Sequence, residues 1–232
     1  HSVMSIYSSP SKKANRGMNI THSPVSRTAK KFNIDLHTPD NLKSIDDLNR
    51  LKDLSPDIIV VIAYGLILPP EILAIPKFGC FNLHASLLPK WRGAAPIQRA
   101  MINGDKKTGI SIIKIDQGLD TGDIVIKKEI DIGENDTQID LENKLSKIGA
   151  ECFTNLFNKL DKNELFEKQD NSKSTYAKKI LKSECKLNWN NSASVIIREI
   201  NAFNPRPGAW FEHENKRIKI WRAKFKVQDG KP

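Results

Sequence analysis

The sequence predicts an α/β protein in which a parallel sheet is followed by a smaller module with a hairpin. A short apolar run at 57–63 is rich in β-branched residues and bounded by turn residues, which is typical of a strand buried on both faces of a parallel sheet. Further strands at 78–84 and 108–115 flank a helix at 94–103, and this order indicates right-handed crossovers. After the polar, aperiodic stretch 161–175 the pattern changes to a short helix and alternating strands.

The elements before this sheet follow from turn and capping residues. Residues 8–24 are rich in Ser, Pro, Gly and Asn and have no periodicity, so we expect a loop. Ser23 precedes a proline and is expected to cap a helix that ends near Phe32. Ser44, with an aspartate three residues later, predicts the start of a helix at 45–54.

The strongest helix signal lies after the third strand. Between Thr137 and Leu160, apolar residues recur at steps of three and four, and Thr137 with Asp140 forms a capping box. Beyond the polar stretch, a helix is expected at 192–203, followed by a hairpin whose turn is Glu214-Asn215.

These elements place a first domain at 1–165, a linker at 166–176 and a second domain at 177–232. The chain begins with His1 in an extended-looking run and breaks off after another strand-like stretch. We therefore expect it to be a piece of a longer protein.

Composition narrows the class of protein. The 232 residues are 39% hydrophobic and 28% charged, which excludes collagen-like, mucin-like and wholly disordered chains. The 37 basic and 27 acidic residues leave a net charge of +10, which attracts polyanions. Three cysteines without a Cys-x-x-Cys pair argue against a zinc site and favour thiols in a reducing compartment. We see no secretion signal or apolar run long enough for a membrane, and expect a cytoplasmic protein.

Candidate catalytic residues lie at the ends of two predicted strands. Asn82 and His84 are two residues apart, so their side chains share a face, and they lie at the carboxyl end where open α/β sheets bind ligands. The segment DQGLDTGD follows the next strand, and its glycines allow a sharp turn that brings Asp120 near the same place. Such a trio could stabilise an oxyanion and move a proton. Alternatively, the histidine is a hydrogen-bonded structural residue, Asn82 a cap, and the aspartates turn formers.

Longer motifs decide between these interpretations by resemblance. The segments FNLHASLLPKWRGAAPIQRAMINGD and TGISIIKIDQGLDTGDIV, together with VVIAYGLILP and AFNPRPGAW, resemble the folate-dependent formyltransferase family. The resemblance implies a Rossmann-like parallel-sheet formyltransferase domain whose first strand–helix unit is missing here. It also implies that the start of a small OB-like β-barrel domain, which binds tRNA, follows.

The resemblance further implies transfer of a formyl group from 10-formyltetrahydrofolate to the α-amine of methionyl initiator tRNA. The amine attacks the formyl carbon, the histidine and asparagine hold the oxyanion, and the aspartate tunes the histidine and helps to accept the proton. A bacterial cytoplasmic enzyme is expected, as a monomer without a metal or a membrane partner. The residues carried over are catalytic Asn82, His84 and Asp120; folate-binding Ser86, Leu87, Leu88 and Pro89; and tRNA-binding Lys12, Lys13 and Arg16.

Two other functions stay open. A formyltransferase acting on an amino sugar nucleotide would share the trio and the folate stretch. A non-catalytic RNA-binding module would explain the positive charge, although the basic loop lacks interleaved stacking aromatics. The basic loop could also be a solvated surface, and Leu87 and Leu88 could be core residues.

Overall fold

The structure is a computed structural model that describes residues 1–14, 19–158, 160 and 166–225. The chain divides into two compact units, His1–Asn82 and Leu83–Pro232. The division falls within strand β6 (Cys80–His84). The domain boundaries derived from the sequence stay a prediction.

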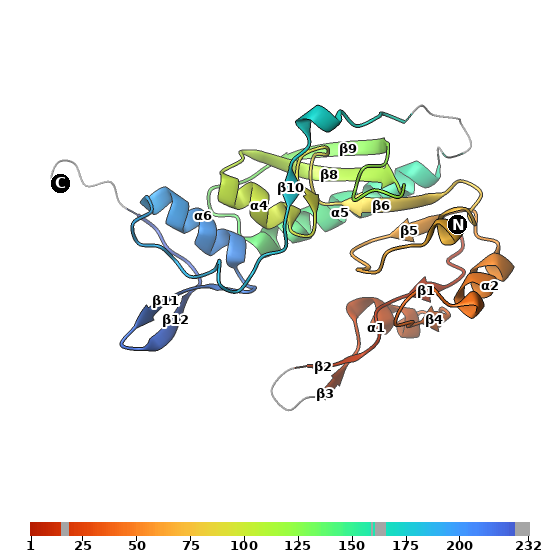
Figure 1. Cartoon of the computed structure of the whole chain (residues 1–232), viewed down its shortest axis with the longest axis horizontal. Coiled ribbons are helices and arrows are strands. Elements are labelled where there is room, and N and C mark those ends of the chain that lie inside the picture. Colours follow the sequence, from red (N-terminus) through yellow and green to blue (C-terminus); the bar gives the residue numbers. More distant parts are fainter. Residues whose placement is uncertain (15–18, 159, 161–165, 226–232) are drawn as a thin grey trace. The chain divides into compact units, whose positions relative to one another are not determined.

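The first unit contains short paired strands and small helices (Figure 1). Strand β1 pairs in parallel with β4, β2 pairs antiparallel with β3, and β5 pairs in parallel with the first part of β6. In chain order its elements before β6 are β1 (Ile6–Tyr7), β2 (Lys12–Ala14), β3 (Asn19–Thr21), α1 (Pro24–Lys31), β4 (Leu36–His37), α2 (Ile45–Leu54), β5 (Ile59–Val61) and α3 (Pro70–Leu73).

Both helices predicted from capping residues in this unit are confirmed. The Ser23 hydroxyl oxygen accepts a hydrogen bond from the Ser26 amide at 2.9 Å, and α1 begins at the following proline. The Ser44 hydroxyl oxygen accepts from the Asp47 amide at 3.1 Å at the start of α2. These contacts satisfy amides that a helix N-terminus otherwise leaves without partners.

The expectation that residues 57–63 form a strand buried on both faces is wrong. Only three of these residues form β5, and Val60 and Ile62 are 39% and 54% exposed. Ile59 packs against the core of the first unit, formed by Leu42, Leu51 and Ile72. Because successive strand residues point to opposite faces, Val60 is turned away from that core.

The second unit is built around an antiparallel strand pair with helices beside it. Its first elements are β7 (Arg92–Gly93), α4 (Pro96–Asn103), β8 (Lys107–Lys114), β9 (Ile124–Asp131) and α5 (Gln138–Phe157). Helix α4 ends at Gly104, whose φ of +80° is left-handed, which confirms the predicted helix. Strand β9 was not predicted from the sequence, because the charged residues at 127–129 interrupt its apolar pattern. With β5–β6 parallel and β8–β9 antiparallel, strand pairing is mixed.

Helix α5 packs along β8 and β9 (Figure 1). The Asp140 carboxylate accepts hydrogen bonds from the Thr137 amide and hydroxyl at 3.0 and 2.6 Å, so the predicted start of the helix is confirmed. Its apolar face buries Leu141 and Leu145, and Gly149 lets Leu83 approach, since an added Cβ would lie 2.6 Å from a Leu83 methyl carbon.

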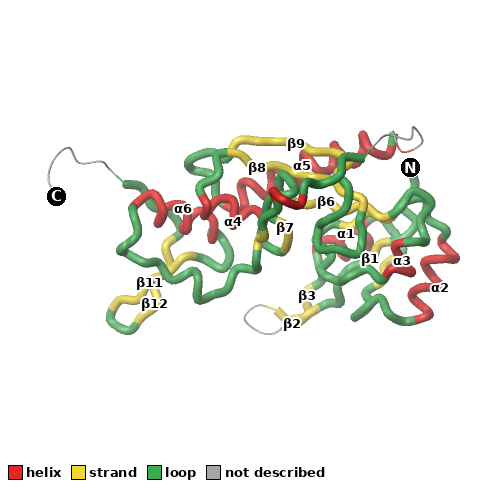
Figure 2. The backbone as a smooth tube through the Cα atoms, turned by 45° about the horizontal axis from the view of Figure 1, so that its top comes forward, coloured by secondary structure: helices red, strands yellow, loops and turns green. Residues whose placement is uncertain are grey.

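The remainder of the second unit has its own small core. The helix predicted at 192–203 is confirmed as α6 (Ala193–Phe203), and the predicted hairpin is confirmed as the antiparallel pair β11–β12. Figure 2 shows this hairpin beside α6. Glu214 and Asn215, the turn residues of the hairpin, both have left-handed φ angles, which suits a two-residue hairpin. Cys185 is fully buried in this core, and burial raises the pKa of its thiol to about 11. The elements are β10 (Tyr176–Ala177), α6 (Ala193–Phe203), β11 (Ala209–His213) and β12 (Lys216–Ile220).

Candidate active site

The candidate site begins on strand β6, which carries both Asn82 and His84. Because the two residues are two positions apart on one strand, their side chains leave the same face. His84 is 5% exposed, so its ring is almost wholly enclosed by protein.

One hydrogen bond and one carboxylate face the two nitrogens of the His84 ring. Its Nε2 lies 2.8 Å from the backbone carbonyl oxygen of Trp91, and its Nδ1 lies 3.5 Å from Asp120 Oδ2. A carbonyl oxygen can only accept, so Nε2 carries the hydrogen in this arrangement. Nδ1 faces the Asp120 carboxylate.

The loop between β8 and β9 brings Asp120 to this position, as the sequence analysis predicts. Asp120 has a φ of +53°, which is unusual for a residue other than glycine. Its Oδ2 accepts a hydrogen bond from the Gly93 amide at 2.8 Å. Gly122 is needed for the turn, because a Cβ there would lie 1.8 Å from the Lys114 carbonyl oxygen. Proximity to His84 is thus built into the loop, while the catalytic roles stay a prediction.

Residues 91–93 hold both members of this pair through their backbone. Trp91 supplies the carbonyl to His84, and Gly93 supplies the amide to Asp120. Strand β7 pairs in parallel with β10, and the Arg92 amide donates to the Thr175 carbonyl at 2.8 Å. This support could not be predicted from the sequence, because backbone contacts do not depend on residue type.

The predicted folate-binding stretch follows directly after His84. Ser86 is fully buried, and its hydroxyl donates to the Lys90 carbonyl at 2.6 Å. Leu88 is 1% exposed and packs with core residues, so its side chain belongs to the interior. Leu87 and Pro89 are half-buried and keep surface that a ligand could reach.

Two of the three predicted tRNA-binding residues lie on strand β2, which pairs with β3. Lys12 and Lys13 belong to β2 by their backbone, and their side chains lie outside what the structure describes. Arg16 lies outside the described residues. Its assignment stays a prediction.

Metal-binding and membrane-spanning features have no support in the described ranges. No cluster of three or more His, Cys, Asp or Glu side chains able to hold a metal is found among these residues. Within the same ranges, every helix is too short or too polar to cross a membrane.

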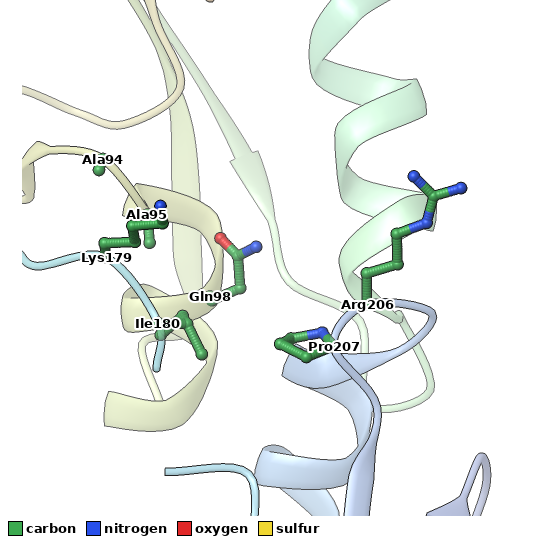
Figure 3. Close-up of a pocket in the computed structure, with 7 residues that line it drawn as sticks. All are labelled: Ala94, Ala95, Gln98, Lys179, Ile180, Arg206 and Pro207. Carbon is green, nitrogen blue, oxygen red and sulfur yellow. The ribbon is translucent and has the colours of Figure 1, made fainter. Parts of the chain in front are cut away.

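A cavity of about 280 Å³ in the second unit is lined by none of the predicted site residues. It is lined by α4, by the segment after β10 and by the turn after α6, and Figure 3 shows Gln98 and Ile180 on one side and Pro207 on the other. Its cationic side chains, Lys179 and Arg206, are both exposed. Because neither His84 nor Asp120 lines this cavity, we assign the chemistry to that pair and not to the cavity.

Comparison with known proteins defines the class. Residues 1–156 match the family model described as formyl transferase, and residues 179–232 match the model of the formyl transferase C-terminal domain. The chain belongs to the formyl transferase family.

The similar proteins narrow this class further. The chain is 46% identical over 222 residues to the methionyl-tRNA formyltransferase of Nitrosomonas eutropha, covering 95% of this chain and 70% of that protein. The solved methionyl-tRNA formyltransferase of Clostridium thermocellum is 25% identical, with a TM-score of 0.68 and coverage of 97% and 94% of the two chains. A sugar N-formyltransferase from a Shewanella species has the same TM-score at 20% identity, with coverage of 87% and 81%, and shows a shared fold.

Proposed function

We propose that this chain transfers the formyl group of 10-formyltetrahydrofolate to the α-amine of methionine on initiator tRNA. The observation that carries the proposal is the buried His84 facing Asp120, in a chain similar over 95% of its length to a methionyl-tRNA formyltransferase. The similar proteins are bacterial methionyl-tRNA formyltransferases. They support tRNA as the partner of this chain and the bacterial cytoplasm as its place of action.

The proposed chemistry follows from the two groups that face the His84 ring, the Trp91 carbonyl and the Asp120 carboxylate. The amine nitrogen attacks the formyl carbon, and the bond from that carbon to N10 of the folate then breaks. The amine loses a proton, which His84 Nδ1 accepts against the Asp120 carboxylate and returns to the leaving N10. Asn82 and the histidine would hold the oxyanion of the tetrahedral intermediate. Because Nε2–H is held by the Trp91 carbonyl, the ring must release that carbonyl before Nε2–H can serve the oxyanion.

The folate donor is proposed to bind beside the end of β6. Leu87 and Pro89 offer half-buried apolar surface next to His84, which suits one face of a flat pterin ring. Ser86 and Leu88 would support this surface from below, because the Ser111 hydroxyl donates to the Ser86 carbonyl and accepts from the Leu88 amide.

An assay of the full chain with two acceptors tests the proposal. We expect formyl transfer from 10-formyltetrahydrofolate to methionyl initiator tRNA and none to an amino sugar nucleotide, with His84→Ala as the inactive control. If only the sugar nucleotide is formylated, the substrate is an amino sugar nucleotide and not tRNA. Binding of tRNA without transfer to either acceptor would favour the RNA-binding module.

A further inference from the structure

A buried arginine lies beside the candidate site and is not used by the proposed chemistry. Arg92 is 2% exposed, so its guanidinium has lost nearly all contact with water. Its Nε and Nη2 donate to Gln169 Oε1 at 3.1 and 2.7 Å, and Nη2 also donates to Asn171 Oδ1 at 2.8 Å. A buried charge requires such partners, because an unsatisfied one is costly.

The arginine fixes the orientation of the Gln169 amide. Guanidinium nitrogens can only donate, so the amide oxygen must face Arg92 and the amide nitrogen must face away. On that far side, Gln169 Nε2 donates to the carbonyl oxygens of Asp120 and Gly122 at 2.8 and 2.7 Å. If the Gln169 amide were flipped, its NH₂ group would face the donors of Arg92, and its oxygen would face the carbonyl oxygens of Asp120 and Gly122. The orientation is therefore determined by chemistry.

These two hydrogen bonds lie at the point where the loop is most strained. Asp120 has a left-handed backbone, which costs of order 1–3 kcal/mol for a residue other than glycine and needs support from its surroundings. Gln169 donates a hydrogen bond to the carbonyl oxygen of Asp120, while the Asp120 carboxylate faces His84 and the Gly93 amide.

We infer that Gln169, oriented by Arg92, is a positioning residue that sets the geometry of Asp120 against His84. The inference rests on the proposed function for its kinetic readout. Gln169 contacts the backbone of the loop, and it acts through the placement of the carboxylate. A displacement of about 1 Å of a catalytic group is enough to lower a rate about 100-fold.

The substitution Gln169→Glu separates positioning from structural support. The carboxylate keeps an acceptor for Arg92 and adds a favourable charge, but it cannot donate to the carbonyls of Asp120 and Gly122. The new ion pair with Arg92 should offset part of the lost contacts with the loop, so we expect the thermal midpoint of the full chain to stay close to the wild-type value. In contrast, kcat for formyl transfer should fall about 100-fold with both KM values nearly unchanged.

Asn171→Ala is the matched control, because it removes the other amide oxygen from Arg92 and leaves the two loop carbonyls satisfied. It should keep a near-wild-type kcat. Equal losses of kcat in Gln169→Glu and Asn171→Ala would overturn the inference, since the role would then be to accommodate the arginine. A wild-type kcat in Gln169→Glu would overturn it as well.

A spectroscopic measurement keeps this test independent of the substrate. The ¹⁵N chemical shift of His84 Nδ1 in the full chain reports its contact with Asp120 and needs neither folate nor tRNA. It should move in Gln169→Glu and stay unchanged in Asn171→Ala. If the wild-type chain formylates no tRNA, the proposed function fails, while an unmoved His84 signal in Gln169→Glu would reject the positioning role.

Discussion

Helix α5 and the segment 166–177 belong to the same unit but contribute to it through different chemistry. The helix buries an apolar face that includes Leu141 and Leu145. The segment is polar, and it holds the candidate site through Gln169 and the pairing of β10 with β7. We therefore expect the apolar helix to govern stability and the polar segment to govern the geometry of the reacting groups.

The largest expected effect comes from the site that the polar segment supports. Asp120→Asn removes the negative charge facing His84 Nδ1 and should lower kcat at least about 100-fold, with little change in the free energy of unfolding. Steady-state kinetics and urea denaturation of the same preparation would measure both. A kcat near the wild-type value would remove Asp120 from the mechanism.

The second largest effect should occur in the helix. Leu141 is fully buried, and Leu141→Ala should lower the free energy of unfolding by about 2–5 kcal/mol. Urea denaturation measures this loss, and kcat per folded molecule should stay close to wild type. If kcat fell as strongly as stability, the division between helix and segment would break down.

A smaller effect, with a pH dependence, is expected at the start of α5. Hydrogen bonds from Thr137 lower the pKa of Asp140, so this carboxylate stabilises the fold most above the pKa of the unfolded chain, about 4. Asp140→Asn should cost about 1 kcal/mol at pH 7. The difference from wild type should shrink as the pH falls through the lowered pKa, because the wild-type carboxylate is then protonated. A difference that stays constant from pH 7 to pH 2 would contradict this origin.

The smallest effect is expected next to Gln169. The exposed Asp170 carboxylate accepts hydrogen bonds from the amide and the hydroxyl of Ser172. These hydrogen bonds lower the pKa of Asp170. None of these contacts reaches the Asp120 loop, so Asp170→Ala should leave kcat within about twofold of wild type. Comparing kcat for substitutions at the neighbouring positions 169 and 170 shows whether positioning depends on Gln169 itself. A large loss in Asp170→Ala would mean that the whole segment, and not one side chain, sets the site.

Much of the fold could be predicted from local patterns. Capping residues locate α1, α2 and α5, and Glu214-Asn215 locates the hairpin. The prediction is wrong about the burial of β5 and misses β9, because covering a sheet face and pairing with a distant strand depend on the rest of the chain.

The candidate site could be predicted only in part. The two-residue spacing of Asn82 and His84, together with the glycines near Asp120, is enough to indicate that His84 and Asp120 lie close together. Nothing in the polar composition of 161–175 distinguishes Gln169 from a linker residue. The role of Arg92 could not be predicted either, since the sequence does not show that its charge becomes buried when the chain folds.

Local elements, their order and the residue types available for chemistry can be derived from the sequence. Periodicity and capping act over a few residues, so a single stretch of chain carries them. The contacts that hold the site form only in the folded unit, because Gln169 lies 49 residues from Asp120 and 77 from Arg92. Contacts over such separations depend on packing of the whole unit and leave no period in the sequence.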